Sequence, residues 1–504
     1  MGTNTGGFRS RAKRSGSDRT ERTPQGGARK ASSAQRRVGR AGVDRQPGKR
    51  SPDRRSAIQG SASHRNPRAT ALDVLRAVHE DGAFANLALP GLLRERDIAG
   101  RDAAFATELT YGTLRAEGLL DIVIAACSSR DVARIDPVIM DILRLGAYQI
   151  LKMRVEDHAA VDTSVRLIED TPRWRAKGFA NAILREITRT PLEQWEEKLA
   201  PEGETAKIAF QTAHPEWIAR SFGRVLGTGE LRQALEADSA RPTVHLVARP
   251  GEISAEELAL ITGGEVGRYS PYAVYLEGGD PGELQPVRDH LAGVQDEGSQ
   301  IIARALTEAP LEGGDGGRWL DLCAGPGGKS ALVAAIGRID GAHLDAVEIA
   351  PHRARLVEQA TQGLPVAVHV ADGRDPGLRP GFDRVLVDAP CSGLGALRRR
   401  PEARWRKSEA DIEELRTLQF ELLRSAAQLT RPGGVVVYST CSPDLRETRE
   451  VVDRALSELS GLTELPAQPL ALGMEDLGEF PSAQMWPHRH GTDAMFFAVL
   501  RVGQ

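Results

Sequence analysis

Two cysteines near the C-terminal end of the chain have the setting of reactive thiols. Cys391 lies in DAPCSGLG and Cys441 in YSTCSP, each just past a strand-like segment. A lone cysteine after a strand is more often a small buried hydrophobic residue than a nucleophile. Two at the same edge of one sheet favour thiolate chemistry, because backbone NH groups and nearby arginines lower a thiol's pKa. Cys127, in a helical stretch, is expected to be structural.

A glycine-rich turn, DLCAGPGGKS, runs from Asp321 to Ser330 between a predicted strand and a predicted helix. Glycines at 325, 327 and 328 allow the backbone to approach a ligand closely. The spacing is neither GxGxxG nor that of a phosphate-binding Walker A loop. We expect Cys323, within this turn, to shape the ligand pocket.

Acidic residues end successive predicted strands beside this turn. Glu348 ends the second strand, where a carboxylate can bind both hydroxyls of a ribose, and Asp372 ends the third, where it can accept from an adenine amino group. Asp388 ends the fourth. Any one of these acids can be explained as a helix cap. Together with Asp321 they make four acids beside a glycine turn, which indicates a nucleoside site. Without a phosphate-binding loop, the site favours the cation S-adenosylmethionine over NAD or ATP.

A basic stretch follows the Cys391 segment. It contains Arg398, Arg399 and Arg400, and then Arg404 and Trp405. A solvated loop would have such a composition, but arginines with an interleaved tryptophan also suit phosphate neutralisation and base stacking. Its place beside the predicted thiols favours RNA binding by these five residues.

The elements that must position these residues form an α/β pattern over 294–504. Strand-like runs at 318–324, 343–349, 366–372, 383–390 and 433–440 alternate with helical segments, and 496–500 adds a last strand. Near-continuous apolar strands joined by helices predict a doubly wound, Rossmann-like sheet covered on both faces. Ligands of such a sheet lie at the carboxyl ends of its strands.

Three further regions precede this domain. Apolar residues at helical spacing over 69–192 predict an all-α domain, in which Asp136 and Pro137 begin a helix. Short strands and a helix predict a small α+β connector over 200–293. Residues 1–68 hold eighteen Lys and Arg against four Asp and Glu, and almost no apolar residues. We expect this segment to be a disordered basic tail that neutralises phosphates, with a solubilising tail as the alternative.

Composition excludes several classes of protein. No apolar run reaches the roughly 18 residues of a membrane span, and no secretory signal is present. Four cysteines in 504 residues are not a disulfide framework, and no CxxC or His/Cys spacing indicates a metal site. We therefore expect a cytoplasmic protein without a metal, with no membrane partner and with reduced thiols.

Together these motifs resemble those of a known family. DLCAGPGGKS, ADGRD, DAPCSGLG, RRRPEARW and YSTCSP are similar to the motifs of the RsmB/NOP family of RNA (cytosine-5)-methyltransferases, as are QDEGSQ (295–300) and HGTDAMFFAVL (490–500). The helical N-terminal block resembles the NusB-like RNA-binding domain of the RsmB branch. The resemblance covers roughly 69–504, and PCSG followed by STCS is its most specific part.

The resemblance implies roles that spacing alone leaves open. It implies that Cys441 is the nucleophile, that Cys391 serves product release and that Asp388 contacts both the cytosine and the cofactor. Glu348 stands where many members have Asp, which changes the geometry of the ribose contact. The implied cofactor, S-adenosylmethionine, would be held by Cys323, Ala324, Gly325, Pro326, Gly327, Gly328, Lys329, Glu348, Asp372 and Asp388. The implied substrate is one cytosine in 16S small-subunit rRNA, methylated at carbon-5 by what we expect to be a monomer.

Other functions remain in view. A small-molecule methyltransferase would not need two thiols. A Rossmann oxidoreductase would carry GxGxxG. An RNA-binding assembly or antitermination factor with little methyltransferase activity is the main alternative, and the intact turn, acids and cysteines argue against it.

Overall fold

A computed structural model describes residues 65–503 of the chain. Most of the basic tail expected over 1–68 lies outside these residues. Within the described part, helix α2 (Pro67–Asp81) already begins at Pro67, where Asn66 caps it by accepting from the backbone NH groups of Arg68 and Ala69. No helix in the described part of the chain is long and apolar enough to cross a membrane.

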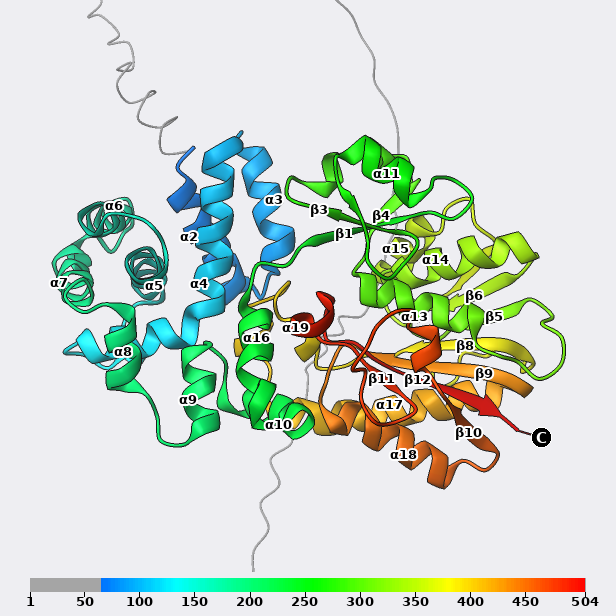
Figure 1. The fold of residues 1–504 in the computed structure, drawn as a ribbon. Helices are drawn as coiled ribbons and strands as arrows, with labels where there is room; N and C mark the ends of the chain where they lie inside the picture. Colours follow the sequence, from blue (N-terminus) through cyan, green and yellow to red (C-terminus); the bar gives the residue numbers. More distant parts are fainter. Residues whose placement is uncertain (1–64, 504) are drawn as a thin grey trace, which may run out of the picture. The chain divides into compact units, whose positions relative to one another are not determined.

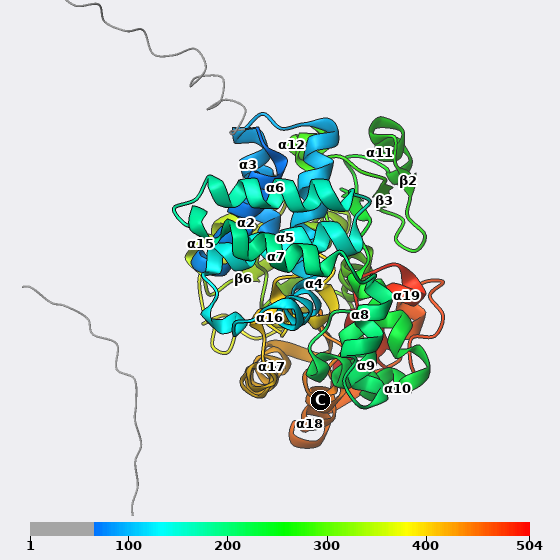
Figure 2. The ribbon, with the colours of Figure 1, turned by 90° about the vertical axis from the view of Figure 1, so that its left-hand side faces the viewer.

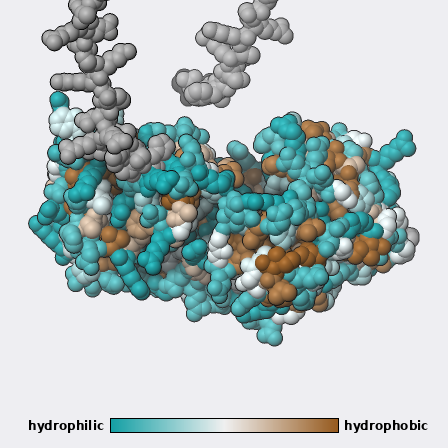
Figure 3. All heavy atoms as spheres, turned by 90° about the horizontal axis from the view of Figure 1, so that it is seen from above, coloured by the Kyte–Doolittle hydropathy of each residue, from teal (hydrophilic) through white to brown (hydrophobic). Residues whose placement is uncertain are grey.

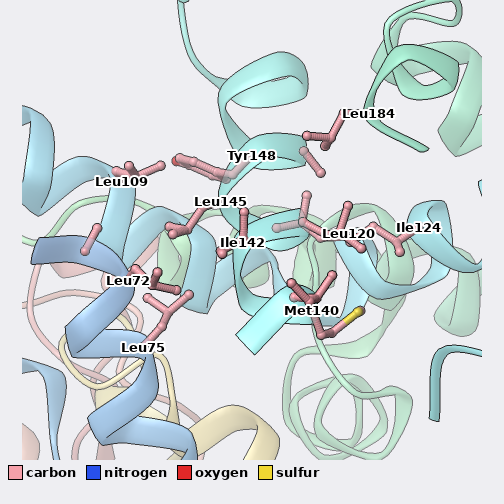
Figure 4. Close-up of a cluster of buried hydrophobic side chains, with 14 of the residues drawn as sticks. Leu72, Leu75, Leu109, Leu120, Ile124, Met140, Ile142, Leu145, Tyr148 and Leu184 are labelled. Carbon is pink, nitrogen blue, oxygen red and sulfur yellow. The ribbon is translucent and has the colours of Figure 1, made fainter. Parts of the chain in front are cut away.

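The N-terminal region is all-helical, as predicted. Asp136 caps α5 and Pro137 occupies its first position, where a missing NH costs nothing. Helices α5, α6 and α7 pack against one another (Figure 2). Buried side chains from α2, α4, α5 and α7 form a common core (Figure 4). The helices are α2 (Pro67–Asp81), α3 (Ala85–Glu95), α4 (Gly100–Cys127), α5 (Pro137–Lys152), α6 (Asp157–Glu169), α7 (Lys177–Ile187) and α8 (Leu192–Leu199).

The connecting region begins with two helices and ends in a small sheet. The strands of this sheet lie in the order β2-β3-β1-β4, and all neighbouring pairs are antiparallel. Helix α11 begins with a complete capping box formed by Ser254 and Glu257. Its elements are α9 (Glu204–Gln211), α10 (Glu216–Ser239), β1 (Val244–Ala248), α11 (Ala255–Thr262), β2 (Glu265–Val266), β3 (Ala273–Leu276), α12 (Gln285–Arg288) and β4 (Ala292–Val294).

The C-terminal domain contains the predicted doubly wound sheet, in the order β10-β12-β9-β8-β5-β6-β7, with β11 paired to β12. Strands β9, β8, β5, β6 and β7 are parallel, β12 pairs antiparallel with β9, and β10 pairs antiparallel with β12. The strands are β5 (Arg318–Asp321), β6 (His343–Val347), β7 (Val366–His369), β8 (Phe382–Asp388), β9 (Thr430–Thr440), β10 (Leu462–Leu465), β11 (Ala483–Gln484) and β12 (Phe496–Val502). The helices are α13 (Glu297–Glu308), α14 (Gly328–Gly337), α15 (Pro351–Ala360), α16 (Ala403–Arg406), α17 (Glu409–Leu429), α18 (Arg449–Glu458) and α19 (Pro487–His490).

Helices cover both faces of this sheet. Figure 1 shows α13, α14 and α15 on one face and α17 and α18 on the other. Val385, Leu386 and Val387 are fully buried, which explains the uninterrupted apolar run of β8. The surface in Figure 3 is mainly hydrophilic, with separate hydrophobic patches. The central strand β5 pairs with β6 on one side and with β8 on the other. The chain passes from β5 to β6 and β7 in one direction and then returns to β8, so the carboxyl ends of β5 and β8 border a topological switch point.

Candidate active site

The two predicted reactive thiols lie side by side at this switch point. Strands β8 and β9 are neighbours, with Asp388 opposite Ser439, so the loops that follow them emerge together. The Cys391 Sγ lies 3.3 Å from the Cys441 Sγ, within hydrogen-bonding range for sulfur. Residues 50 positions apart in the sequence therefore form one pair.

The two thiols have different environments. The hydrogen bond with Cys441 raises the pKa of Cys391 well above its usual value, and burial raises it further. Cys391 is therefore expected to keep its proton at neutral pH, and the geometry of the contact allows either sulfur to be the donor. Burial likewise raises the pKa of Cys323, followed by the charge of Asp321, so this third thiol is also protonated.

A charged pair lies beside Cys441. The Lys329 Nζ donates to Asp388 Oδ2 at 2.7 Å, and the Ser439 hydroxyl donates to Asp388 Oδ1 at 2.9 Å. Burial lowers the pKa of Lys329, but the charge and hydrogen bond of Asp388 and the charge of Cys441 together raise it. The ammonium group thus stays protonated, close enough to favour a negative sulfur at Cys441.

The glycine turn is held against the end of β6. Gly325 donates its NH to Glu348 Oε2 at 3.1 Å, and Ala350 donates to Oε1 at 2.9 Å. A Cβ at position 325 would lie 2.1 Å from that Glu348 oxygen, so only glycine fits. Gly327 has φ 108° and opens α14. Each Glu348 oxygen accepts one backbone NH, which leaves lone pairs for a diol.

Asp321 orders the turn from beneath. Its carboxylate accepts from the Ser330 hydroxyl at 2.7 Å and from the Cys323 NH at 3.2 Å. Burial, with a smaller contribution from the charge of Asp388, raises its pKa to about 6, against the lowering effect of the Ser330 hydrogen bond. Asp321 therefore shapes the turn from inside the fold.

Two exposed apolar side chains next to the acids were not predicted from the sequence. Ile349 follows Glu348 and is 63% exposed, while Val370 follows β7 and is 57% exposed. The register of β6 and β7, with Val347 opposite His369, places them at neighbouring strand ends. Apolar surface beside a ribose-binding acid suits the faces of an adenine ring. These residues, the turn and the acids fit S-adenosylmethionine.

Asp372 lies at the same edge but is already paired. Arg374 donates to both of its carboxylate oxygens, with Nη2 2.6 Å from Oδ2, and donates to Glu421 at 3.1 Å. These hydrogen bonds lower the pKa of Asp372. An adenine amino group would share this carboxylate with Arg374.

A buried polar network beneath the cysteine loops was also missed. Glu447, which is 0% exposed, accepts from the Ser392 NH at 2.8 Å, from the Ser392 hydroxyl and from Gln419 Nε2 at 3.1 Å. The Ser392 hydroxyl also lies 3.1 Å from that of Ser442. Glu447 thus fixes Ser392, the residue after Cys391, and Ser392 in turn contacts Ser442, the residue after Cys441. Because Glu447 and Ser392 are 55 residues apart, no local pattern could reveal this contact.

The structure places Arg398 and Arg399, which were predicted to bind RNA, against buried acids of the protein itself. Arg398 is 6% exposed and donates to Asp493 at 2.7 Å, and Arg399 donates to Asp493 and to Asp296 at 2.7 Å. Both guanidinium groups neutralise two buried acids, one from QDEGSQ and one from HGTD. Gly395 allows the close approach, since a Cβ there would lie 1.9 Å from the Ala494 carbonyl oxygen.

Arg404 and Trp405 are likewise structural, contrary to the prediction. Arg404 is 0% exposed; it donates to Asp238 Oδ2 at 3.1 Å and to the Ala213 carbonyl at 2.9 Å. The Trp405 Nε1 donates to the Leu114 carbonyl at 2.7 Å. Helix α16 thereby anchors the loop after Cys391 to α4 and α10. Of the five predicted RNA-binding residues, Arg400 is exposed.

Comparisons with known proteins agree with this site. The model of the 16S rRNA methyltransferase RsmB/F family matches residues 309–501, and the NusB family model matches 65–189. The chain is 57% identical to "Putative methyltransferase MT1451" of Mycobacterium tuberculosis, covering 86% of this chain and 96% of that protein. It is 31% identical to "Ribosomal RNA small subunit methyltransferase B" of Enterobacter sp. (strain 638), covering 86% and 98%.

Solved structures share the fold. The crystal structure of PH0851 has a TM-score of 0.73 at 23% identity and covers 88% of this chain and 98% of its own. A methyltransferase homologue from Pyrococcus horikoshii has a TM-score of 0.51 at 22% identity and covers 60% of this chain and 100% of its own. With the turn, the acids and the paired cysteines, these likenesses identify an S-adenosylmethionine-dependent methyltransferase. The chain belongs to the RsmB/F family of 16S rRNA methyltransferases, with a NusB-type helical domain.

Proposed function

We propose that the protein methylates carbon-5 of a cytosine in 16S rRNA, through a covalent bond between Cys441 and carbon-6 of the base. The observation that carries this proposal is the 3.3 Å contact between the Cys391 and Cys441 sulfurs beside the Lys329–Asp388 pair. Carbon-5 of cytosine is a poor nucleophile, so a methyltransferase acting there needs a thiolate and a means to remove it. A methyltransferase acting on nitrogen or oxygen needs neither.

Cys441 is the attacking sulfur in this proposal. Cys391 keeps its proton, and the charge of the nearby Lys329 ammonium would stabilise a thiolate at Cys441. Addition of the Cys441 thiolate to carbon-6 places an electron pair on carbon-5. S-adenosylmethionine, when bound, supplies an electrophilic methyl group to that pair. The Asp388 carboxylate is suited to accept from the exocyclic amino group of the base.

Cys391 completes the cycle by removing the carbon-5 proton. The largest cause of its raised pKa is its hydrogen bond with Cys441, which disappears when Cys441 becomes a thioether. The pKa of Cys391 then falls and its proton leaves to solvent. The Cys391 thiolate takes the proton from carbon-5, the carbon-5–carbon-6 double bond re-forms, and the Cys441 thiolate departs. One proton is released for each methyl group transferred.

The proposed substrate follows from the family and from the names of its relatives. The target base must reach a pocket at the sheet edge, which requires a single-stranded or extruded cytosine. We place the substrate base against Cys441 and assign RNA as the partner of the protein.

Transfer of a tritiated methyl group to unmodified 16S rRNA, followed by nucleoside analysis, tests this function. The expected product is labelled 5-methylcytidine. Label in another nucleoside, or none while the cofactor is bound, would overturn the proposal.

A further inference from the structure

A cavity of about 400 Å³ lies between the NusB-type domain and the helices that follow it. One wall comes from α4 and α5, and the other from α9 and α10. Three basic side chains line it, namely Arg115, Lys152 and Arg232, together with Glu196 and Glu236. The cavity thus combines positive charge from two parts of the chain.

Arg115 provides the main indication that this cavity binds a ligand. Its Nε is buried without a hydrogen-bond partner, and no ion pair to its guanidinium occurs among residues 65–503. Burial lowers the pKa of Arg115, an effect that the charge of Glu108 opposes. Arg115 is partly buried and lines the cavity, so an anion bound there would be attracted by its charge.

The other two cations hold their acids only loosely. The Lys152 Nζ lies 3.9 Å from Glu196, and the Arg232 Nη1 lies 3.8 Å from Glu236. Both contacts are longer than hydrogen bonds, so both groups have donors available. Three cations facing two carboxylates leave the cavity with positive charge for an incoming anion.

The cavity is also tied to the catalytic domain. Arg404 donates to the backbone carbonyl of Arg115 at 3.3 Å and to the Ser239 hydroxyl at 3.0 Å, which places a fourth cation beneath the cavity. The charge of Arg115 contributes to the lowered pKa of Arg404, after burial. Arg404 follows the Cys391 loop in the chain, so an anion bound here would be positioned relative to the thiols.

From this geometry we infer that the cavity binds a backbone phosphate of the RNA substrate. The inference rests on the proposed function, because it assigns the phosphate to the RNA whose base enters the active site. A guanidinium presents paired donors that match phosphate oxygens, and Lys152 and Arg232 provide charge from the sides. The phosphate would fix the distance between the helical domain and the target base.

The test compares RNA affinity of the full chain with that of Arg115→Gln over a series of salt concentrations, without cofactor. One lost phosphate contact lowers the salt slope by about 0.7–0.9. We expect that decrease and a loss of affinity of about tenfold at low salt. Arg166→Gln, in an exposed i,i+4 pair on α6, is the matched control and is expected to bind like wild type.

Two additional variants and a phosphate titration complete the test. Lys152→Gln and Arg232→Gln, on partly exposed side chains, repeat the affinity measurement if Arg115→Gln does not fold. Unchanged affinity and slope in folded variants would overturn the inference while leaving methyl transfer intact. Arg115-dependent binding of inorganic phosphate with unchanged RNA affinity would assign the cavity to a free anion and would also overturn it. Failure of the proposed function would appear instead as wild-type RNA binding without methyl transfer.

Discussion

Replacement of Arg404 by leucine is expected to destabilise the protein rather than to weaken RNA binding directly. The leucine would leave Asp238, which is 0% exposed, facing only His214 Nε2 at 3.1 Å, and would leave the Ala213 carbonyl without its donor. Removing one partner of a buried ion pair costs about 3–5 kcal/mol. We therefore expect the free energy of unfolding of Arg404→Leu to fall by about 4 kcal/mol in urea titrations followed by circular dichroism.

The loss should depend on pH. His214 has a pKa of about 4, lowered first by burial and then by the charge of Arg404. Without Arg404 its pKa rises, so protonated His214 can neutralise Asp238 as the pH falls towards about 5. The destabilisation should accordingly be smaller at about pH 5 than at about pH 8.

Arg400→Leu is the matched control because Arg400 is exposed in the same segment. Its effect on unfolding should stay within about 0.5 kcal/mol. An Arg404→Leu protein of wild-type stability with much weaker RNA binding would refute the structural role and support RNA binding by Arg404 instead.

Three further substitutions test the site. Gly325→Ala should weaken cofactor binding at least about tenfold in calorimetry, because the new Cβ would displace Glu348; unchanged affinity would contradict the close approach. Asp321→Asn should stabilise the protein at about pH 8 by up to about 3 kcal/mol, because the folded-state pKa of about 6 disfavours the buried charge. Below the unfolded-state pKa of the aspartate, the stabilities of the two proteins should converge. A wild-type protein that is more stable than Asp321→Asn in thermal unfolding at about pH 8 would contradict this prediction. Glu447→Gln should cost about 2 kcal/mol in urea unfolding and slow methyl transfer, because one of the two oxygens that accept from the Ser392 NH and hydroxyl becomes an NH2 donor; a wild-type rate of methyl transfer would show that this network does not position the cysteines.

The features predicted best from the sequence are those set by neighbouring residues. The apolar run over 383–390 predicted a buried parallel strand, and β8 (Phe382–Asp388) is that strand. The glycine turn was placed correctly between β5 and α14, because its residues are adjacent in the chain. Cys391 and Cys441 could be placed at one edge, because both follow parallel strands.

The roles of the basic stretch could not be predicted in this way. An arginine-rich segment has the same local pattern whether it faces RNA, solvent or buried acids. The partners that decide the matter are distant, since Asp238 is 166 residues from Arg404 and the Leu114 carbonyl is 291 residues from Trp405. The acids Asp296 and Asp493 were visible in the two flanking motifs, and pairing them with Arg398 and Arg399 would have been the available signal.

A trapped covalent intermediate would distinguish the proposed roles of Cys391 and Cys441. Cys391→Ala should still allow attack and methyl transfer but should lack the group that removes the carbon-5 proton. Incubation with 16S rRNA and S-adenosylmethionine, digestion with ribonuclease and protease, and mass spectrometry should therefore find a methylated cytidine bound to Cys441. A cytidine attached to another residue, or full turnover by Cys391→Ala without an adduct, would contradict the account.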